Sequence, residues 1–316
     1  MITEALQQLA GIFSRRFFFN ALLPTFIFVT AATSTIVASS WSIEATFSLW
    51  ERLGLLTRLL ILLAYFALVY FLSAAVQSQW RNIVRLFEGY PLRTLQSRFP
   101  CTALVGENWH EKRMKDLQGD DEEKVDMDKA YSWYPLGAHE DPVKALPTRL
   151  GNILLAGEHY SYRHYGIDTI IFWPRLYPLL PESFQREYGK FVIQHQFPLV
   201  VAFEASITTA ICAITLLVTH ASAIIFVTVL LSGTVVAYGA YILSLESATE
   251  LAEQQRAAFD LFRDRLLIAW PAARDVRDEK LAFKSIHKFV KYGDPADWER
   301  PRDAYVNRRK PSQGAP

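Results

Sequence analysis

Residues 146–166, LPTRLGNILLAGEHYSYRHYG, gather side chains that could do chemistry. His159 and His164 are five residues apart, about 140° around a helix, so they do not share a metal-binding face. His159 and Arg163 are four apart and could face one ligand. Arg149, near the start of the expected helix, and Arg163 could contact a phosphate. The stretch therefore indicates either packing of aromatic and cationic side chains between a helix and the membrane surface, or binding of an anion or nucleotide.

Enzyme motifs are absent from the sequence. It contains no GxxxxGK[ST], GxGxxG, GxSxG or HExxH segment and no paired CxxC. Cys101 and Cys212 are far apart, which excludes a disulfide framework and fits a reducing cytoplasmic setting. The net charge of +1 gives no global electrostatic argument for nucleic-acid binding. We expect no catalytic residue, no metal and no cofactor.

Four apolar segments approach the length of about 20 residues that a bilayer core requires; they are residues 17–39, 59–77, 197–219 and 221–243. Hydrophobic residues make up 51% of the chain and mean hydropathy is +0.10, which indicates that about a third of it lies in the membrane. Basic residues flank the first pair of segments on one side: Arg15, Arg16, Arg81 and Arg85. The positive-inside rule therefore places both termini and the 78–196 segment in the cytoplasm.

The predicted fold class is a mainly α, polytopic membrane protein with four transmembrane helices. A small cytoplasmic α(+β) domain would lie between helices 2 and 3, and a helical extension would follow helix 4. The expected parts are an interfacial helix at 1–16, helices 1–2 at 17–77, the cytoplasmic domain at 78–196, helices 3–4 at 197–243, and the extension with its tail at 244–316. The sequence places a capped helix, from Thr148 to Gly166, inside the domain.

Three further local predictions concern the parts outside the spans. DTIIFW (168–173) is β-branched and aromatic, which predicts a strand. Residues 106–145, with the acidic run DDEEKVDMD, indicate a solvated loop or a partly ordered excursion. From Leu245 to Ala269 apolar residues alternate spacings of three and four, as in a heptad seam. This seam indicates either packing on the chain's own cytoplasmic domain or self-association.

The third span carries a polar stripe along one face, made of Glu204, Thr208, Cys212, Thr215 and Thr219. An ionisable residue inside a span is costly in lipid, so it must face protein or water. The stripe is either a helix contact joined by hydroxyls or the lining of a water-filled path. Span four offers a face of small residues for close helix contact: Gly233, Ala237, Ala240 and Ser244. In a symmetric oligomer, Glu246, Glu250 and Glu253 would add acidic rings at the cytoplasmic mouth.

One segment resembles a family of largely uncharacterised bacterial four-pass membrane proteins. The resemblance rests on PTRLGN at 147–152, YG at 165–166 and WPRL at 173–176, with the LP pair at 23–24. The layout is also similar to that of membrane effectors of bacterial anti-phage systems such as Hailong, in which a channel subunit is controlled by a nucleic-acid product. This resemblance implies the bacterial inner membrane and a nucleotide or oligonucleotide ligand. It carries no catalytic residues.

The sequence thus predicts an oligomeric pore or ion channel in the lipid bilayer, gated through its cytoplasmic domain. The expected contacts with an anionic ligand are Arg149, His159, Arg163 and Arg175. The alternative is a non-conducting membrane anchor that recruits a cytoplasmic partner protein. A membrane enzyme acting on lipid would need clustered polar residues that the sequence does not offer.

Overall fold

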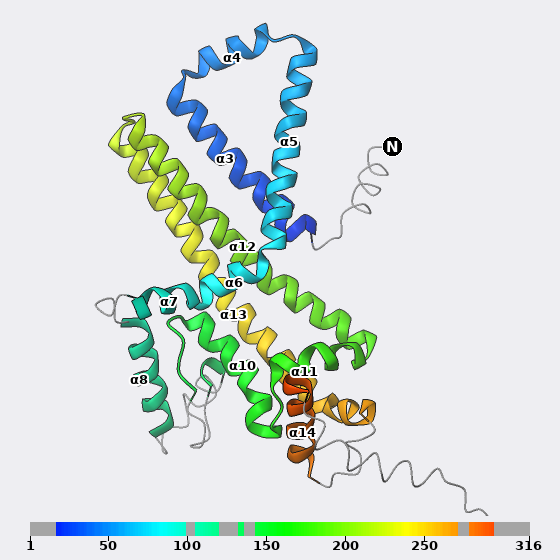
Figure 1. Cartoon of the computed structure of the whole chain (residues 1–316). Coiled ribbons are helices and arrows are strands. Elements are labelled where there is room, and N and C mark those ends of the chain that lie inside the picture. Colours follow the sequence, from blue (N-terminus) through cyan, green and yellow to red (C-terminus); the bar gives the residue numbers. More distant parts are fainter. Residues whose placement is uncertain (1–16, 99–104, 120–131, 136–142, 271–277, 294–316) are drawn as a thin grey trace, which may run out of the picture. The chain divides into compact units, whose positions relative to one another are not determined.

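The computed structural model describes residues 17–98, 105–119, 132–135, 143–270 and 278–293, and every regular element in these ranges is a helix (Figure 1). The chain forms two compact units. Unit 1 comprises residues 1–91 and 191–247, and unit 2 comprises residues 92–190 and 248–316. The mainly helical class is confirmed, whereas the β component expected between spans 2 and 3 is wrong for the described residues.

Four helices are long and apolar enough to cross a membrane, as predicted, and the chain has the character of a membrane protein. The first consists of the π-helical turn η1 (Phe18–Leu22) and α3 (Leu23–Ser40). The others are α5 (Leu55–Ser78), α12 (Glu182–Val218) and α13 (Ala223–Ala269). Both α12 and α13 continue beyond their apolar parts into unit 2.

Short helices connect the spans of unit 1. α4 (Ile43–Arg52) lies between α3 and α5, and Ser42 caps it by accepting a hydrogen bond from the Ala45 amide. α6 (Trp80–Glu88) follows α5 and ends at Gly89, whose φ of 89° suits a residue without a Cβ. α7 (Tyr90–Arg98) then begins directly.

The small-residue face of α13 contacts α12 within unit 1. A Cβ atom added at Gly233 would lie 1.9 Å from Thr209 Oγ1, so only glycine permits this approach. Ala240 and Ser244 on the same face are buried. The close helix contact predicted from the spacing of small residues is present in the structure.

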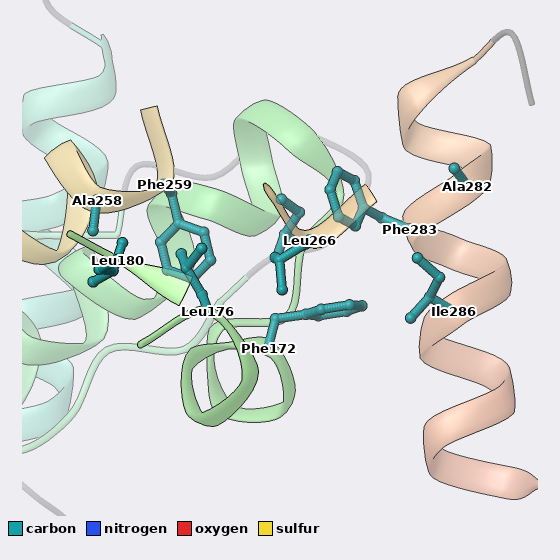
Figure 2. Packing of buried hydrophobic residues seen from close by; sticks show 10 residues of the cluster. Phe172, Leu176, Leu180, Ala258, Phe259, Leu266, Ala282, Phe283 and Ile286 are labelled. Atoms are coloured by element: carbon teal, nitrogen blue, oxygen red, sulfur yellow. The ribbon is translucent and has the colours of Figure 1, made fainter. Parts of the chain in front are cut away.

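Unit 2 has a hydrophobic core formed by α11, α13 and α14 (Figure 2). Its helices are α8 (Val105–Gly119), α10 (Arg149–Tyr165), α11 (Thr169–Leu176), the 3₁₀ turn η3 (Tyr177–Leu179) and α14 (Glu279–Tyr292), with the ends of α12 and α13. The buried cluster consists of Ile167, Phe172, Leu176, Leu180, Ala258, Phe259, Leu266, Ala282, Phe283 and Ile286. The Phe172 and Phe283 rings meet edge to face at 5.6 Å.

The helix predicted between Thr148 and Gly166 is confirmed as α10. Thr148 Oγ1 accepts a hydrogen bond from the Gly151 amide at 3.1 Å. Gly166 has a φ of 70° and its amide bonds to the Tyr162 carbonyl, which closes the last turn. Local capping chemistry therefore sets both ends of this helix.

The strand predicted at DTIIFW is wrong, because these residues begin α11. The Asp168 side chain accepts hydrogen bonds from the amides of Ile170 and Ile171, which makes it an N-cap. Phe172 and Leu176, four residues apart, both enter the core of unit 2 (Figure 2). Burial at helical spacing thus overrides the strand propensity of β-branched residues.

The apolar seam of α13 is covered within the chain. Ala252 packs against Gly157 of α10, where an added Cβ would lie 2.8 Å from the Ala252 Cβ. Phe259 and Leu266 are buried with residues of α11 and α14. Packing on the chain's own second unit, one of the two interpretations of the seam, therefore accounts for its apolar residues.

The loop expected at 106–145 is wrong in its first part, where α8 forms. The acidic run at 120–128, the N-terminal helix expected at 1–16 and the tail from Asp294 lie outside the described residues. The described part of the expected helical extension at 244–316 also contains α14.

Replacing Gly157 by alanine tests the α10–α13 contact. Alanine favours a helix over glycine by about 1 kcal/mol, but the new Cβ would press on Ala252. We expect the Gly157→Ala chain to lose about 1–3 kcal/mol of unfolding free energy. The matched control is Gly189→Ala in α12, where nothing lies within 4 Å of an added Cβ and stability should stay equal or rise. Thermal unfolding in detergent measures both, and equal midpoints would contradict the contact.

Candidate functional site

Buried polar side chains lie along the contact between the first span and α12 in unit 1. The buried polar residues of unit 1 are Asn20, Thr25, Ser73, His195, Gln196, Glu204 and Ser244. Four of them pair across this contact, Asn20 with Gln196 and Thr25 with Glu204. We call these four residues the polar seam, because they join two apolar helices through side-chain hydrogen bonds.

Glu204 is the charged member of the polar seam. Thr25 Oγ1 donates a short hydrogen bond to Glu204 Oε1. Only 7% of Glu204 is exposed, and its Oε2 has no hydrogen-bond partner among the described residues. A carboxylate in this position retains an open acceptor inside a protein interior, which is unusual and points to a further group, such as water or a cation, at this oxygen.

Asn20 and Gln196 form the second hydrogen-bonded pair of the polar seam. Asn20 Nδ2 donates to Gln196 Oε1 at 3.2 Å and lies 3.4 Å from the Ile193 carbonyl. Asn20 belongs to the π turn η1, where the Leu23 amide bonds to the Phe18 carbonyl five residues back. Because a π turn brings residues five apart round to nearly the same side, Asn20 and Thr25 both face α12.

A cavity of about 260 Å³ continues the polar seam beyond Glu204. Residues of α3, α12 and α13 line it: Phe28, Ala31, Thr35, Ala205, Thr208, Thr209, Cys212, Val229, Ser232, Gly233 and Val236. Its lining is largely apolar, with hydroxyl groups from each of the three helices. The cavity has room for several water molecules, at about 30 Å³ each in the liquid.

The predicted stripe on α12 divides into two parts. Glu204, Thr208 and Cys212 face α3 and α13 of the same chain, at the polar seam or the cavity. Thr215 and Thr219 donate to carbonyl groups of their own helix, Ile211 and Thr215 respectively, both at 2.9 Å. Sequence spacing found Glu204 but missed its partner Thr25, because the contact joins residues 179 positions apart.

The three glutamates expected at a cytoplasmic mouth lie on α13. Glu246 and Glu250 are exposed. Glu253 forms an ion pair with Arg256 at 2.7 Å, and Arg256 itself is buried and lies over the Tyr160 ring. Glu253 thus has a structural partner within unit 2.

The four residues expected to bind an anion have different surroundings in unit 2. The Arg149 guanidinium lies 3.7 Å from the centre of the Trp133 ring, and the His159 ring lies beside Tyr162. Arg163 is exposed. Arg175 is exposed too and donates to the Ile171 carbonyl of its own helix at 2.5 Å.

The tyrosines of the 146–166 stretch connect α10 to α13. Tyr160 and Tyr165 donate to the Asp260 carboxylate, at 3.0 Å and 2.7 Å. Arg263 lies over the Tyr165 ring and pairs with Glu279 of α14 at 2.9 Å. These aromatic and cationic side chains therefore join α10, α13 and α14 to one another.

No group of three or more His, Cys, Asp or Glu residues that could hold a metal occurs within the described ranges. Comparison with protein-family models, with curated proteins and with solved structures finds no match. The resemblance to the four-pass family and to Hailong-type effectors therefore stays a prediction. The structure by itself defines a helical membrane protein with a polar seam between its apolar helices.

The partly buried carboxylate of Glu158 in unit 2 gives a pH-dependent prediction. Burial raises the pKa of Glu158 above its usual value, and the negative charge of Asp168 raises it further. A raised folded-state pKa contributes stability at low pH that is lost as the pH rises through that pKa. Glu158→Gln should therefore raise the thermal midpoint more at pH 7 than at pH 4. Asp264→Asn, at an exposed site on α13, is the control, and equal effects of Glu158→Gln at both pH values would contradict the assignment.

Proposed function

We propose that this protein conducts cations across the bacterial inner membrane, with both termini in the cytoplasm and with unit 2 controlling the flow. The observation that carries the proposal is the series of polar groups along α12. From Gln196 through Glu204 to Cys212 it covers 16 residue steps, about 24 Å of helix, against a hydrocarbon core of about 30 Å. Ionisable residues within spans are rare, face the protein interior or a water-filled cavity, and mark ion or substrate paths.

The carboxylate of Glu204 sets the sign of the proposed permeant ion. A single negative group inside an apolar surrounding attracts cations and repels anions. Because Thr25 of the same chain bonds to Glu204 and the cavity is lined by three helices of one chain, we propose that the path runs inside each subunit. The oligomeric pore expected from the sequence would have placed it on a symmetry axis. Homo-oligomerisation stays a prediction, which the solution mass in detergent tests.

Unit 2 is proposed as the control element because two helices are common to both units. α12 and α13 each run without interruption from the apolar segments of unit 1 into unit 2. A ligand or a partner protein that shifts α10 would act on α13 through Gly157 and Ala252, which are in direct contact. A nucleotide or oligonucleotide is the ligand class that the resemblance implies, with Arg149 and Arg163 as contacts to test first.

Cation flux into liposomes that contain the purified protein tests the proposal. We expect Glu204→Gln to lower the flux about tenfold or more, a change that corresponds to at least ~1.4 kcal/mol, because it removes the charge at the centre of the path. Glu187→Gln, at an exposed carboxylate of the same helix that pairs with Lys190, is the control and should keep full flux. Absence of flux in the unmodified protein would refute the proposed function.

The second candidate is the non-conducting anchor, favoured by the hydrogen bond that joins Thr25 of α3 to Glu204 of α12 within one chain. In that case the Thr25–Glu204 pair only holds α3 against α12, and two apolar side chains of similar volume would stabilise this contact equally well. The double variant Thr25→Val, Glu204→Leu should then keep the thermal midpoint and the capture of cytoplasmic partners. The conduction proposal instead expects this variant to fold and to lose flux.

A further inference from the structure

We infer that the cation carried along the polar seam is the proton, and that Glu204 is the group that takes it up and releases it. This inference rests on the proposed function and narrows it to one substrate.

The Glu204 carboxylate lies among closely packed side chains, where a metal ion with its ligands would need additional space. Thr25 and Ala205 beside it are almost fully buried, with 3% and 1% exposed, and the Thr25 hydroxyl contacts the carboxylate directly. The cavity begins beyond this point, at Ala205 and Thr208. A proton needs no such space, because it moves by exchange along hydrogen bonds.

The donor atoms present at Glu204 also disfavour a metal ion. Ca²⁺ takes about 6–8 oxygen ligands and Mg²⁺ needs a near-octahedral set. The described residues around Glu204 provide one carboxylate and one hydroxyl, and they contain no cluster of metal-binding side chains. A single carboxylate, with Oε2 lacking a hydrogen-bond partner among the described residues, is instead sufficient to bind one proton.

The proton step can be written on named atoms. A lone pair of Glu204 Oε2, the oxygen without a partner among the described residues, forms an O–H bond with a proton delivered by hydronium, and water leaves. The hydrogen bond from Thr25 to Oε1 is kept throughout. In the reverse step the O–H bond breaks, its electron pair returns to the carboxylate and the proton passes to water. Protonation removes the charge whose burial is costly, so the neutral form is tolerated between apolar helices.

Polar groups lie on both sides of Glu204 along the helix. On one side is the cavity, with hydroxyls of Thr35, Thr208 and Ser232 in its lining. On the other side is the Asn20–Gln196 pair, where Asn20 Oδ1 also has no partner among the described residues. These groups can hold water that passes a proton to or from Glu204.

His195, another buried titratable residue of α12, is outside this route. It lies nine residues from Glu204, about 180° around the helix and so on the opposite face. Its ring packs edge to face on Trp80 at 6.0 Å. Thr25 donates a hydrogen bond to the Glu204 carboxylate, and the ion pairs of the described residues do not include Glu204.

Ion-specific flux measurements on the full chain test the inference. Liposomes with a pH-sensitive dye inside are given a proton gradient, while parallel samples receive labelled sodium or potassium. We expect proton uptake without sodium or potassium uptake. Glu204→Gln should lower proton flux at least tenfold, Glu204→Asp should keep part of it, and Glu187→Gln should keep all of it.

Three other outcomes of the flux measurements would overturn part or all of the inference. Sodium or potassium uptake that depends on Glu204 would overturn the proton assignment and leave the proposed function standing. Proton uptake that survives Glu204→Gln would overturn the role of Glu204. Absence of any cation flux would refute the proposed function itself, and the inference with it.

A second measurement does not depend on transport. In the infrared difference spectrum of the purified protein on acidification, one component of the carbonyl band of protonated carboxylic acids should belong to Glu204 and be lost in Glu204→Gln. Equal elution volume and equal thermal midpoint show that the variant is folded. A spectrum that Glu204→Gln leaves unchanged would overturn the inference even if flux falls.

Discussion

A carboxylate buried between apolar helices is the constraint on which the arrangement of unit 1 depends. Leaving such a group without partners costs several kcal/mol, so the chain must supply hydrogen bonds wherever Glu204 lies. Thr25 supplies one, and this requirement fixes which face of α3 meets α12. Gln196 lies eight residues before Glu204, about 12 Å along α12, and accepts a hydrogen bond from Asn20 of the first span. These two hydrogen-bonded pairs define how the first span and α12 are shifted along each other and how each is rotated about its own axis. Apolar contacts alone would define neither.

The π turn at the start of the first span follows from the same constraint. In a regular α-helix, residues five apart point in clearly different directions, so Asn20 and Thr25 could not both reach α12. The extra residue accommodated by η1 brings them to one side. On the other face of α12, Thr209 meets Gly233 of α13, where the absence of a side chain permits the approach. Close packing on one face of α12 and polar pairing on another leave the cavity between the three helices.

The sequence predicted those features that local chemistry decides. Spans follow from length and hydropathy, and the ends of α10 follow from Thr148 and Gly166 because caps act within a few residues. The helix α11 was missed because its β-branched residues favour a strand, and only the burial of Phe172 and Leu176 in a core built by distant segments decides otherwise. In the candidate site, Glu204 stood out as a charge within a span. Thr25 could not be identified as its partner, since nothing in the spacing of one helix indicates which face of another helix meets it.

The distance in sequence between these partners also bears on how the protein is made. Asn20 and Thr25 are synthesised before their partners, which belong to α12 and follow 176 and 179 residues later. At about 5–20 residues per second, the first span waits on the order of 10–40 s before α12 is synthesised. During that time the amide and the hydroxyl must be accommodated by water, by lipid headgroups or by the insertion machinery. The final register of the first helix is therefore set late in biogenesis, by a segment that arrives after the first pair of spans is complete.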